Sequence, residues 1–598
     1  MRWQPLTPLT ATANLPLLTI QDDDSIFASG DTAKRDDYEI TLKASDQPIT
    51  AIRLEALPDD RLPAGGPGST YYEGTLGDFY LTEIDVHADG RAFAFTGASE
   101  TYSKNRFGNN PATAAKAIDG DIQTGWSVHG RQAERHVAVF VLKEPLPAGT
   151  DVRIHMSFGR HFASSLGRFR FSATSSTQAP EARPWSDHVA LLLSDPDREL
   201  NSHEADVLMT EFLLQTSQLA EDAEKIRKLR MRPEATSTLV LAERPDNAIR
   251  PTHRHHRGEY LQPKEEVQPG LPEILRAGSN ESPGNRLEFA RWLVSDSNPL
   301  TARVTVNRQW AAIFGTGLVK TVDDFGMQGE SPSHPELLDW LAVTFRETDR
   351  WSLKALHRRI VCSSTYRQSS VRNPDSLSID PGNRLLSSSP RYRLDAEVIR
   401  DQLLVAAGVL HDEVGGPPVR PLQPDGVTEA AYGSPSWTAS PGTGRYRRSL
   451  YTFTKRTAPF AMFSTFDAPS GEACVARRDR SNSPLQALTL LNDVMLLDLS
   501  RQMGAHFSMA SITSGDLEFL TEMFRRVLVR PPTSAELDLL TSFQQEQHSA
   551  FTADPASAFR FLEIDANSGI TSETIVSHAA WSATARALFG LDEALTRP

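Results

Sequence analysis

The sequence predicts a multidomain protein with an N-terminal antiparallel β-sandwich and a mainly α-helical, loop-rich C-terminal domain. Three observations carry this prediction. The chain has 598 residues, several times the length of one domain of about 100–200 residues. Up to about Ser176 apolar and polar residues alternate with a period of two, and from Asn285 onward apolar residues recur at helical spacing. We expect a sandwich over residues 1–178, a linker, long helix and extended connector over 179–260, and the helical domain over 261–598.

The alternating segments define the strands of the sandwich. They cover residues 38–42, 52–56, 137–142, 152–158 and 168–173. In the last of these, Phe169 and Phe171 fall on one face, and Arg168 and Arg170 fall on the other. Because no helical period separates these segments, an antiparallel sandwich fits them best.

Capping signals place the helices that follow. Asn201 with Glu204 predicts the start of one long amphipathic helix, which Pro233 ends. The β-branched run at residues 236–242 predicts an extended connector.

In the C-terminal part, Asn298 opens a helix that closes at Gly315, and Ser333 with Glu336 predicts another capping box. Ser483 opens a further helix through LQALTLLNDVMLLDLSRQM. Long loops at residues 415–446 and 468–483 are favoured places for a functional site.

Composition excludes several classes of protein. The chain has 62 basic and 76 acidic residues and a formal net charge of −14, which argues against nucleic acid as the main partner. The two cysteines, Cys362 and Cys474, form no haem-attachment motif, and we expect both to be buried. The sequence has no phosphate loop or dinucleotide fingerprint, so neither haem nor nucleotide is expected as a cofactor.

The N-terminal residues do not predict a signal peptide, because prolines and threonines interrupt each apolar run. Nowhere are about 18 apolar residues uninterrupted, so no membrane span is expected. Read literally, with Met1 as the true start, the chain is expected to be cytoplasmic.

A candidate metal site lies in the strand-rich region. Asp119, Asp121 and Thr124 place hard oxygen ligands around Gly120, as Ca²⁺ prefers. The alternative is an ordinary Asp-Gly-Asp turn without metal.

With Trp126 the same residues, Ala117-Ile118-Asp119-Gly120-Asp121 and Thr124, resemble the discoidin or galactose-binding-like jelly roll. The resemblance implies a structural Ca²⁺ held by Asp119, Asp121 and Thr124, with Trp126 in the core or at the rim. Such modules often add a glutamate near the last strand, and residues 167–178 contain none. The resemblance also implies sugar binding at one end of the sandwich, where we expect contacts from four side chains that offer hydrogen-bond donors: His129, Arg131, His161 and Arg168.

A second resemblance covers about residues 236–598. The stretches RLEFARWLVSDSNPLTARVTVNRQWAAIFGTGLVKTVDDFGMQGESPSHPELLDWLA, YRRSLYTFTKRTAPFAMFSTFDAP and SNSPLQALTLLND resemble the planctomycete-type Domain of Unknown Function 1553 family. Members often carry cytochrome-c-like domains and a secretion signal. The resemblance therefore implies an extracytoplasmic location, periplasmic or secreted, and other secreted proteins of the same system as partners.

Weak catalytic candidates are Arg303, Asp324 and His334, which would need to converge in one pocket. For Arg303 and its helical neighbour Asn307, the favoured interpretation is that they bind loop carbonyls under the turn at Gly315.

A cluster of arginines is the candidate anion site. Residues 445–480 hold eight basic and three acidic residues, and Arg447, Arg448, Arg477 and Arg478 are the expected ligand contacts, because arginine binds carboxylate and sulfate through two parallel hydrogen bonds. The favoured alternative is that these arginines pair with acidic residues such as Asp395, Glu397 and Asp401 and hold the long loops in place.

Together these features predict non-catalytic recognition or scaffolding of a complex polysaccharide, acidic or sulfated. Two alternatives stay open. One is an enzyme or redox function: a glycan-directed hydrolase, or a redox-accessory component whose haem domains are absent from this chain. The other is a protein–protein interaction scaffold.

Overall fold

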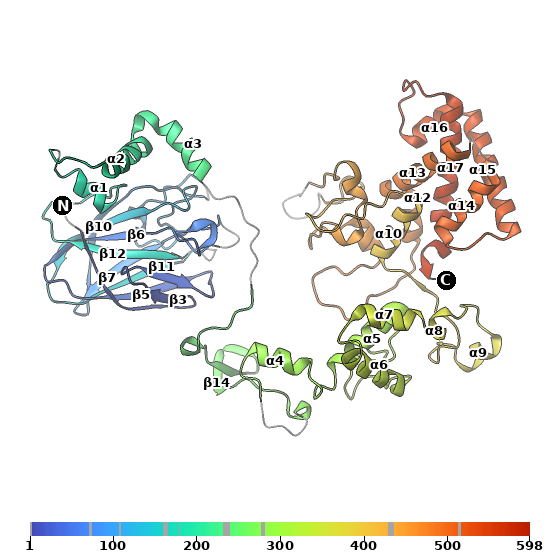
Figure 1. Ribbon diagram of the computed structural model, residues 1–598, viewed down its shortest axis with the longest axis horizontal. Coiled ribbons are helices and arrows are strands. Elements are labelled where there is room, and N and C mark those ends of the chain that lie inside the picture. The colour runs from blue at the N-terminus through green and yellow to red at the C-terminus, as the bar shows by residue number, and fades with distance from the viewer. Residues whose placement is uncertain are drawn as a thin grey trace. The chain divides into compact units, whose positions relative to one another are not determined.

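The computed structural model describes residues 3–70, 75–106, 109–159, 165–178, 180–195, 197–230, 240–276, 282–428, 436–511 and 516–597. The chain forms two compact units, Met1–Gln268 and Pro269–Pro598 (Figure 1). Residue 260, the last residue of the predicted connector, lies inside a strand of the first unit.

The first unit contains the expected antiparallel sandwich (Figure 1). One sheet has the strand order β3 (Leu17–Ile20), β4 (Ile26–Ser29), β12 (Arg168–Thr174), β6 (Ile49–Ala56), β10 (His136–Leu146) and β9 (Phe95–Glu100), with β1 (Gln4–Pro5) also paired to β12. The other has the order β2 (Pro8–Ala13), β5 (Asp36–Leu42), β11 (Val152–Phe158), β7 (Glu83–Ala88) and β8 (Arg91–Phe93). Each of the five predicted strand segments lies within one of these strands.

The core of the sandwich is formed by the side chains of each strand that point toward the opposite sheet. Tyr38, Phe158 and Phe169 are fully buried and pack ring against ring. The Tyr38 hydroxyl donates a hydrogen bond to the Leu166 carbonyl, 3.0 Å away, which satisfies the one polar group of this cluster. Trp126 is also fully buried, edge-on to Phe79, so it is a core residue.

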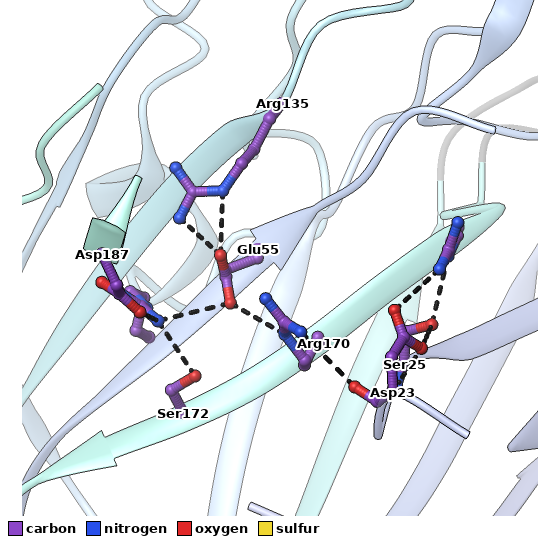
Figure 2. Close-up of polar contacts among 9 residues, drawn as sticks. Asp23, Ser25, Glu55, Arg135, Arg170, Ser172 and Asp187 are labelled. Atoms are coloured by element: carbon purple, nitrogen blue, oxygen red, sulfur yellow. Dashed lines mark hydrogen bonds and ion pairs between the residues drawn. The ribbon is translucent and has the colours of Figure 1, made fainter. Parts of the chain in front are cut away.

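The outward face of the larger sheet carries a buried ion network around Glu55 (Figure 2). Glu55 is 1% exposed and accepts hydrogen bonds from the guanidinium groups of Arg53, Arg135 and Arg170. Burial by itself raises the pKa of Glu55, but these three cations more than offset it and hold the pKa below its usual value. The carboxylate therefore stays ionised inside the structure.

The same network fixes the first helix, α1 (Asp187–Leu192). Arg53 donates to both carboxylate oxygens of Asp187, at 2.6 and 2.8 Å. Asp187 lies in the first turn of α1, where a negative charge also meets the positive end of the helix dipole. The ion network thus attaches α1 to the face of the sheet.

The prediction of a single long helix after Asn201 is wrong, because the chain forms two helices, α2 (Ser202–Gln215) and α3 (Ala220–Arg230). The capping box of Asn201 and Glu204 is confirmed. Thr216, a β-branched residue with extended backbone angles, ends α2, and a short 3-10 turn follows. Arg227 of α3 then donates to the Leu214 carbonyl of α2. The predicted connector at residues 236–242 lies mostly outside the described residues.

A two-stranded ribbon, β13 (Thr252–His256) and β14 (Glu259–Val267), closes the first unit. Every residue of β14 is exposed.

The second unit is mainly helical, as predicted, with a two-stranded pairing of β15 (Tyr392–Arg393) with β16 (Thr596–Arg597). Its helices are α4 (Arg286–Leu293), α5 (Thr301–Phe314), α6 (Pro335–Glu347), α7 (Leu353–Val361), α8 (Ser364–Arg367), α9 (Pro374–Ile379), α10 (Ala396–Ala406), α11 (Ala461–Thr465), α12 (Pro484–Asn492), α13 (Val494–Ser511), α14 (Asp516–Leu528), α15 (Ser534–Ala553), α16 (Pro555–Leu562) and α17 (Ser572–Phe589).

Apart from a small cluster between α16 and α17, two apolar cores organise these helices. The smaller joins α5, α6 and α7 around residues such as Trp310, Phe314 and Phe345. The larger joins α10, α13, α14 and α17. At the α13–α17 contact a side chain on Gly504 would lie 2.1 Å from the Ser582 hydroxyl, so only glycine permits this close packing.

The helix ends correct two predictions. His334, not Ser333, is the N-cap of α6, because the Ser333 hydroxyl donates to the Leu318 carbonyl instead. The helix predicted from Ser483 is divided at Asp493, which ends α12 in an extended conformation and whose carboxylate accepts from the Met495 amide at the start of α13. Ser483 is the N-cap of α12, as predicted, and it forms a capping box with Gln486.

Surface features add two findings. Cys362 and Cys474 are both exposed, so the expectation of buried thiols is wrong; each lies beside a helix end or in a loop, outside the two cores. In the described part of the chain, no helix combines the length and apolar character that crossing a membrane requires.

We predict that Glu55→Gln lowers the unfolding free energy of the sandwich by about 3 kcal/mol, because it leaves buried guanidinium groups without their counter-charge. Hydrogen exchange of the β6 amides in the full chain measures this change. Glu39→Gln is the matched control, since Glu39 is exposed on β5. Equal protection in the two variants would show that the network does not stabilise the sheet.

Candidate functional site

Two adjoining cavities in the helical unit form one cleft. The first, of about 530 Å³, is lined by Arg308, residues 315–317, Lys320 and residues 476–480. The second, of about 610 Å³, is lined by residues 320–323, Glu330 and residues 474–477, with Asp479. Lys320, Arg477 and Asp479 line both cavities, so we treat them as one feature and call it the cationic cleft.

One wall of the cationic cleft is the loop that follows α5. Asn307 is fully buried, and its side chain donates to the Val319 carbonyl and accepts from the Val319 amide, at 2.9 and 2.8 Å. A side chain on Gly317 would collide with these same groups. The expected role of Asn307 in binding a loop carbonyl is therefore confirmed, and its effect is to fix the wall beside Lys320.

The opposite wall is the loop of residues 476–480, held by ion pairs to the start of α10. Arg478 donates two hydrogen bonds to Glu397, at 2.5 and 3.1 Å, and lies 3.6 Å from Asp395. Arg480 lies 3.7 Å from Asp395 and stacks on the Tyr392 ring. The hydrogen bond with Glu397 raises the pKa of Arg478, so this pairing persists at any physiological pH.

Arg308 and Arg477 lie in the cleft, and neither has an ion-pair or hydrogen-bond partner among the described residues. Both side chains are exposed. Lys320 lies beside them, and its one ion pair is with Glu330 at 3.3 Å, where both groups are half exposed. The cleft therefore presents two free guanidinium forks and a weakly held ammonium, which is a favourable arrangement for a carboxylate, sulfate or phosphate.

Two of the four predicted anion contacts, Arg447 and Arg448, do not line the cleft. Arg447 is 4% exposed, donates to the carbonyls of Glu413, Gly415 and Pro417, and stacks on Tyr451. Arg448 lies 3.9 Å from Asp401. These contacts, with those of Arg478, match the alternative in which the arginines hold the long loops. Of the four predicted contacts, Arg477 is the one left free to meet a ligand.

The weak catalytic candidates make separate local contacts. Arg303 pairs with Asp339 and donates to the Pro299 carbonyl. Asp324 accepts from the Gly326 amide, and the His334 ring meets the Ser333 hydroxyl. None of these three side chains lines either cavity of the cationic cleft.

At one end of the sandwich, His129 and Arg131 lie beside Tyr102, and we call this group the rim. The Tyr102 hydroxyl donates to the His129 carbonyl, and the Arg131 guanidinium lies 4.1 Å from the centre of the Tyr102 ring. The His129 ring nitrogen Nδ1 lies 2.9 Å from the Thr75 hydroxyl and 3.8 Å from the carboxylate of Asp78. The structure thus brings two of the four predicted sugar contacts together.

A third predicted sugar contact, Arg168, is not at the rim. Arg168 binds Asp23, Ser25 and Asp59 on the face of the larger sheet, where Asp23 and Ser25 lie near Arg170 (Figure 2). These contacts occupy its guanidinium group. His161 lies outside the described residues.

The predicted calcium ligands lie together in one turn. The Thr124 hydroxyl is 2.9 Å from both carboxylate oxygens of Asp119, and Asp121 accepts from the Gln123 amide. The carbonyls of Lys116 and Asp121 lie within 3.2 Å of the same hydroxyl. Lys116 pairs with Asp119 at 3.0 Å. Among the described residues, no group of three or more histidine, cysteine, aspartate or glutamate side chains is placed to hold a metal ion.

Sequence reasoning missed Glu83, on strand β7. Its oxygen Oε1 is buried and has no hydrogen-bond partner among the described residues. Burial, followed by the charge of Asp119, raises the pKa of Glu83 to about 7. The glutamate missing from the last strand thus has a counterpart beside the same turn, supplied by a strand distant in sequence.

Comparisons with known proteins support part of the resemblance. Residues 285–544 match the family described as protein of unknown function (DUF1553), which supports assignment of the helical region to it. No curated protein matches the chain. Two solved structures of the catalytic domain of a GH87 alpha-1,3-glucanase, in complex with nigerose and with tetrasaccharides, are each 16% identical and match 36% of this chain and 34% of their own, with a TM-score of 0.14. A likeness this weak carries no argument about fold or function.

The buried acid of the rim gives a pH-dependent prediction. Burial raises the pKa of Asp78 to about 6, against the hydrogen bonds from the Phe79 amide and the Ser127 hydroxyl. Between about pH 4 and pH 6 the folded chain therefore holds a proton that the unfolded chain has lost, and stability falls as the pH rises through this window. The substitution Asp78→Asn should remove this pH-dependent fall in stability.

We expect the unfolding free energy of Asp78→Asn, relative to the parent chain, to rise by about 2 to 3 kcal/mol between pH 4 and pH 7. Denaturant titration at a series of pH values measures it, with exposed Asp46→Asn as the control. If the difference in unfolding free energy between Asp78→Asn and the parent chain did not change with pH, the raised pKa of Asp78 would be contradicted.

Proposed function

We propose that the protein binds an anionic polysaccharide without cleaving it, and that the cationic cleft is the binding site. The observation that carries the proposal is the pair of unpartnered guanidinium groups, Arg308 and Arg477, in one cleft of the helical unit. The whole chain has a net charge of −14, so this unpaired positive charge is a local feature. Hydrogen bonds of Asn307 and Arg478 hold the two loops that line the cleft.

Several features support a sugar polymer as the ligand. The cleft comprises two adjoining cavities, which leaves room for more than one sugar unit. Its lining mixes arginines with hydroxyl, carboxylate and small apolar side chains, which can meet the hydroxyls and the ring carbons of a sugar. The net negative charge of the whole protein opposes binding of nucleic acid outside the cleft.

The rim offers a second contact for the same kind of ligand. Tyr102 with Arg131, and His129 with Thr75, combine an aromatic face with hydrogen-bonding groups. Two separate sites on one chain would strengthen the hold on a polymer that reaches both.

We predict that Arg308→Ala and Arg477→Ala each weaken binding of dextran sulfate about tenfold at low salt, because each removes one charge-assisted contact. Affinity of the parent chain should fall steeply between about 10 and 150 mM salt, as the Debye length shortens from about 30 to 8 Å. Titration calorimetry or a polymer-retardation gel measures both effects.

Arg525→Ala is the matched control, since Arg525 is exposed on α14 of the same unit and has no partner among the described residues. Neutral dextran is the control ligand. If Arg477→Ala and Arg525→Ala lost equal affinity for dextran sulfate, binding would be a general effect of surface charge. The cleft would then not be the binding site.

A second proposal concerns a structural calcium ion in the sandwich. Glu83, whose buried oxygen has no hydrogen-bond partner among the described residues, lies near the carboxylates of Asp119 and Asp121. A divalent cation would stabilise such a cluster of carboxylates. As placed, these side chains form no metal-holding group, so Glu83, Asp119 and Asp121 would have to draw together around the ion, with the Thr124 hydroxyl and nearby carbonyls completing the oxygen shell. Lys116, which is partly exposed, would have to leave Asp119.

We expect about 1 mM calcium to raise the melting temperature of the sandwich by about 5 °C relative to chelator, by mass action on the folded state. Glu83→Gln and Asp119→Asn should each remove most of this increase, and Asp46→Asn should retain it. A melting curve that calcium does not move would reject the metal and leave the fold unaffected.

A further inference from the structure

The distribution of charge along the cationic cleft is uneven. Around the first cavity, five basic side chains face two acidic ones: Arg308, Lys320, Arg477, Arg478 and Arg480 against Asp395 and Asp479. Around the second, Lys320 and Arg477 face three acids, Asp323, Glu330 and Asp479. The excess charge therefore changes sign from one end of the cleft to the other.

The acids of the second cavity differ in how far they are neutralised. Glu330 is paired with Lys320 and lies 3.9 Å from Arg384. Asp323 and Asp479 are exposed and have no ion-pair or hydrogen-bond partner among the described residues. Two free carboxylates thus lie in the same cleft as the two free guanidinium groups.

Free carboxylates accept hydrogen bonds from sugar hydroxyls and repel anionic groups. Val475, which is 55% exposed, and Ala476 add an apolar surface to this second cavity, against which the carbon face of a sugar ring can pack. The second cavity is therefore suited to an uncharged, hydroxyl-bearing sugar.

We propose, on the basis of the proposed function, that the cleft selects a sparsely charged polysaccharide. One sulfate or carboxylate lies between Arg308 and Arg477 in the first cavity, and the hydroxyls of an uncharged neighbouring sugar meet Asp323 and Asp479 in the second. A polymer with an anion on every unit places negative charge against these carboxylates and is disfavoured. The acids of the cleft thus disfavour polyphosphate and densely sulfated chains, a discrimination that arginines alone cannot provide.

The test compares three probes on the full chain at one salt concentration: sparsely sulfated dextran, densely sulfated dextran and inorganic polyphosphate. Affinities are expressed per anionic group. The parent chain should bind the sparse polymer about tenfold more tightly than either dense polyanion.

The variant Asp323→Asn, Asp479→Asn should abolish this preference. Its affinity for the two dense polyanions should rise about tenfold as two repulsive charges are removed, with no gain for the sparse polymer. Glu546→Gln, which removes an exposed charge on α15, should change none of the three affinities. Both positions are exposed, so the variant is expected to fold, and its melting temperature checks this.

The outcomes separate the two proposals. Two outcomes overturn the selectivity and leave the proposed function standing. In the first, binding depends on the arginines but the parent chain shows no preference among the three probes. In the second, the aspartate variant gains the same affinity for all three probes. Binding that is insensitive to Arg308→Ala and Arg477→Ala, or no binding of any probe, overturns both.

Discussion

The candidate site depends on one interaction, the pairing of Arg478 with Glu397 at the start of α10. This two-point contact, with Arg480 beside Asp395, fixes a loop that has no regular secondary structure. Because Arg478 and Arg480 are neutralised by α10, the charge of their neighbour Arg477 is left over. Asn307 holds the opposite loop with two hydrogen bonds of its own, so both loops that line the cleft are held in place.

This arrangement separates structural from functional arginines within a single cluster. Burial and pairing distinguish them: Arg447 is enclosed by main-chain carbonyls and Arg478 by carboxylates, whereas Arg477 and Arg308 are exposed and unpartnered in the described part of the chain. A paired arginine contributes rigidity, and its loss would move the loop. An unpaired arginine costs little to the fold and remains free for an external anion.

Much of the fold could be predicted from the sequence, because period and capping are local signals. The strands of the sandwich, the capping boxes at Asn201 and Ser483 and the glycine end of α5 were all predictable in this way. The breaks at Thr216 and Asp493 were not, since a single residue with extended angles interrupts an otherwise continuous apolar pattern. The site was only partly predictable: Arg477 belonged to a visible basic cluster, but Arg308, Lys320 and Glu83 come from segments distant in sequence, and only the folded chain shows their neighbours.

The central claim is that Arg308 and Arg477 form one anion site, and a double-mutant cycle tests it most directly. Dextran sulfate affinity is measured for the parent chain, Arg308→Ala, Arg477→Ala and the double variant at low salt. If both arginines hold the same anion, the double variant loses clearly less than the two single losses combined, because the second substitution removes a partner from a contact already broken. Losses that add fully, as for independent distant charges, would contradict a shared site.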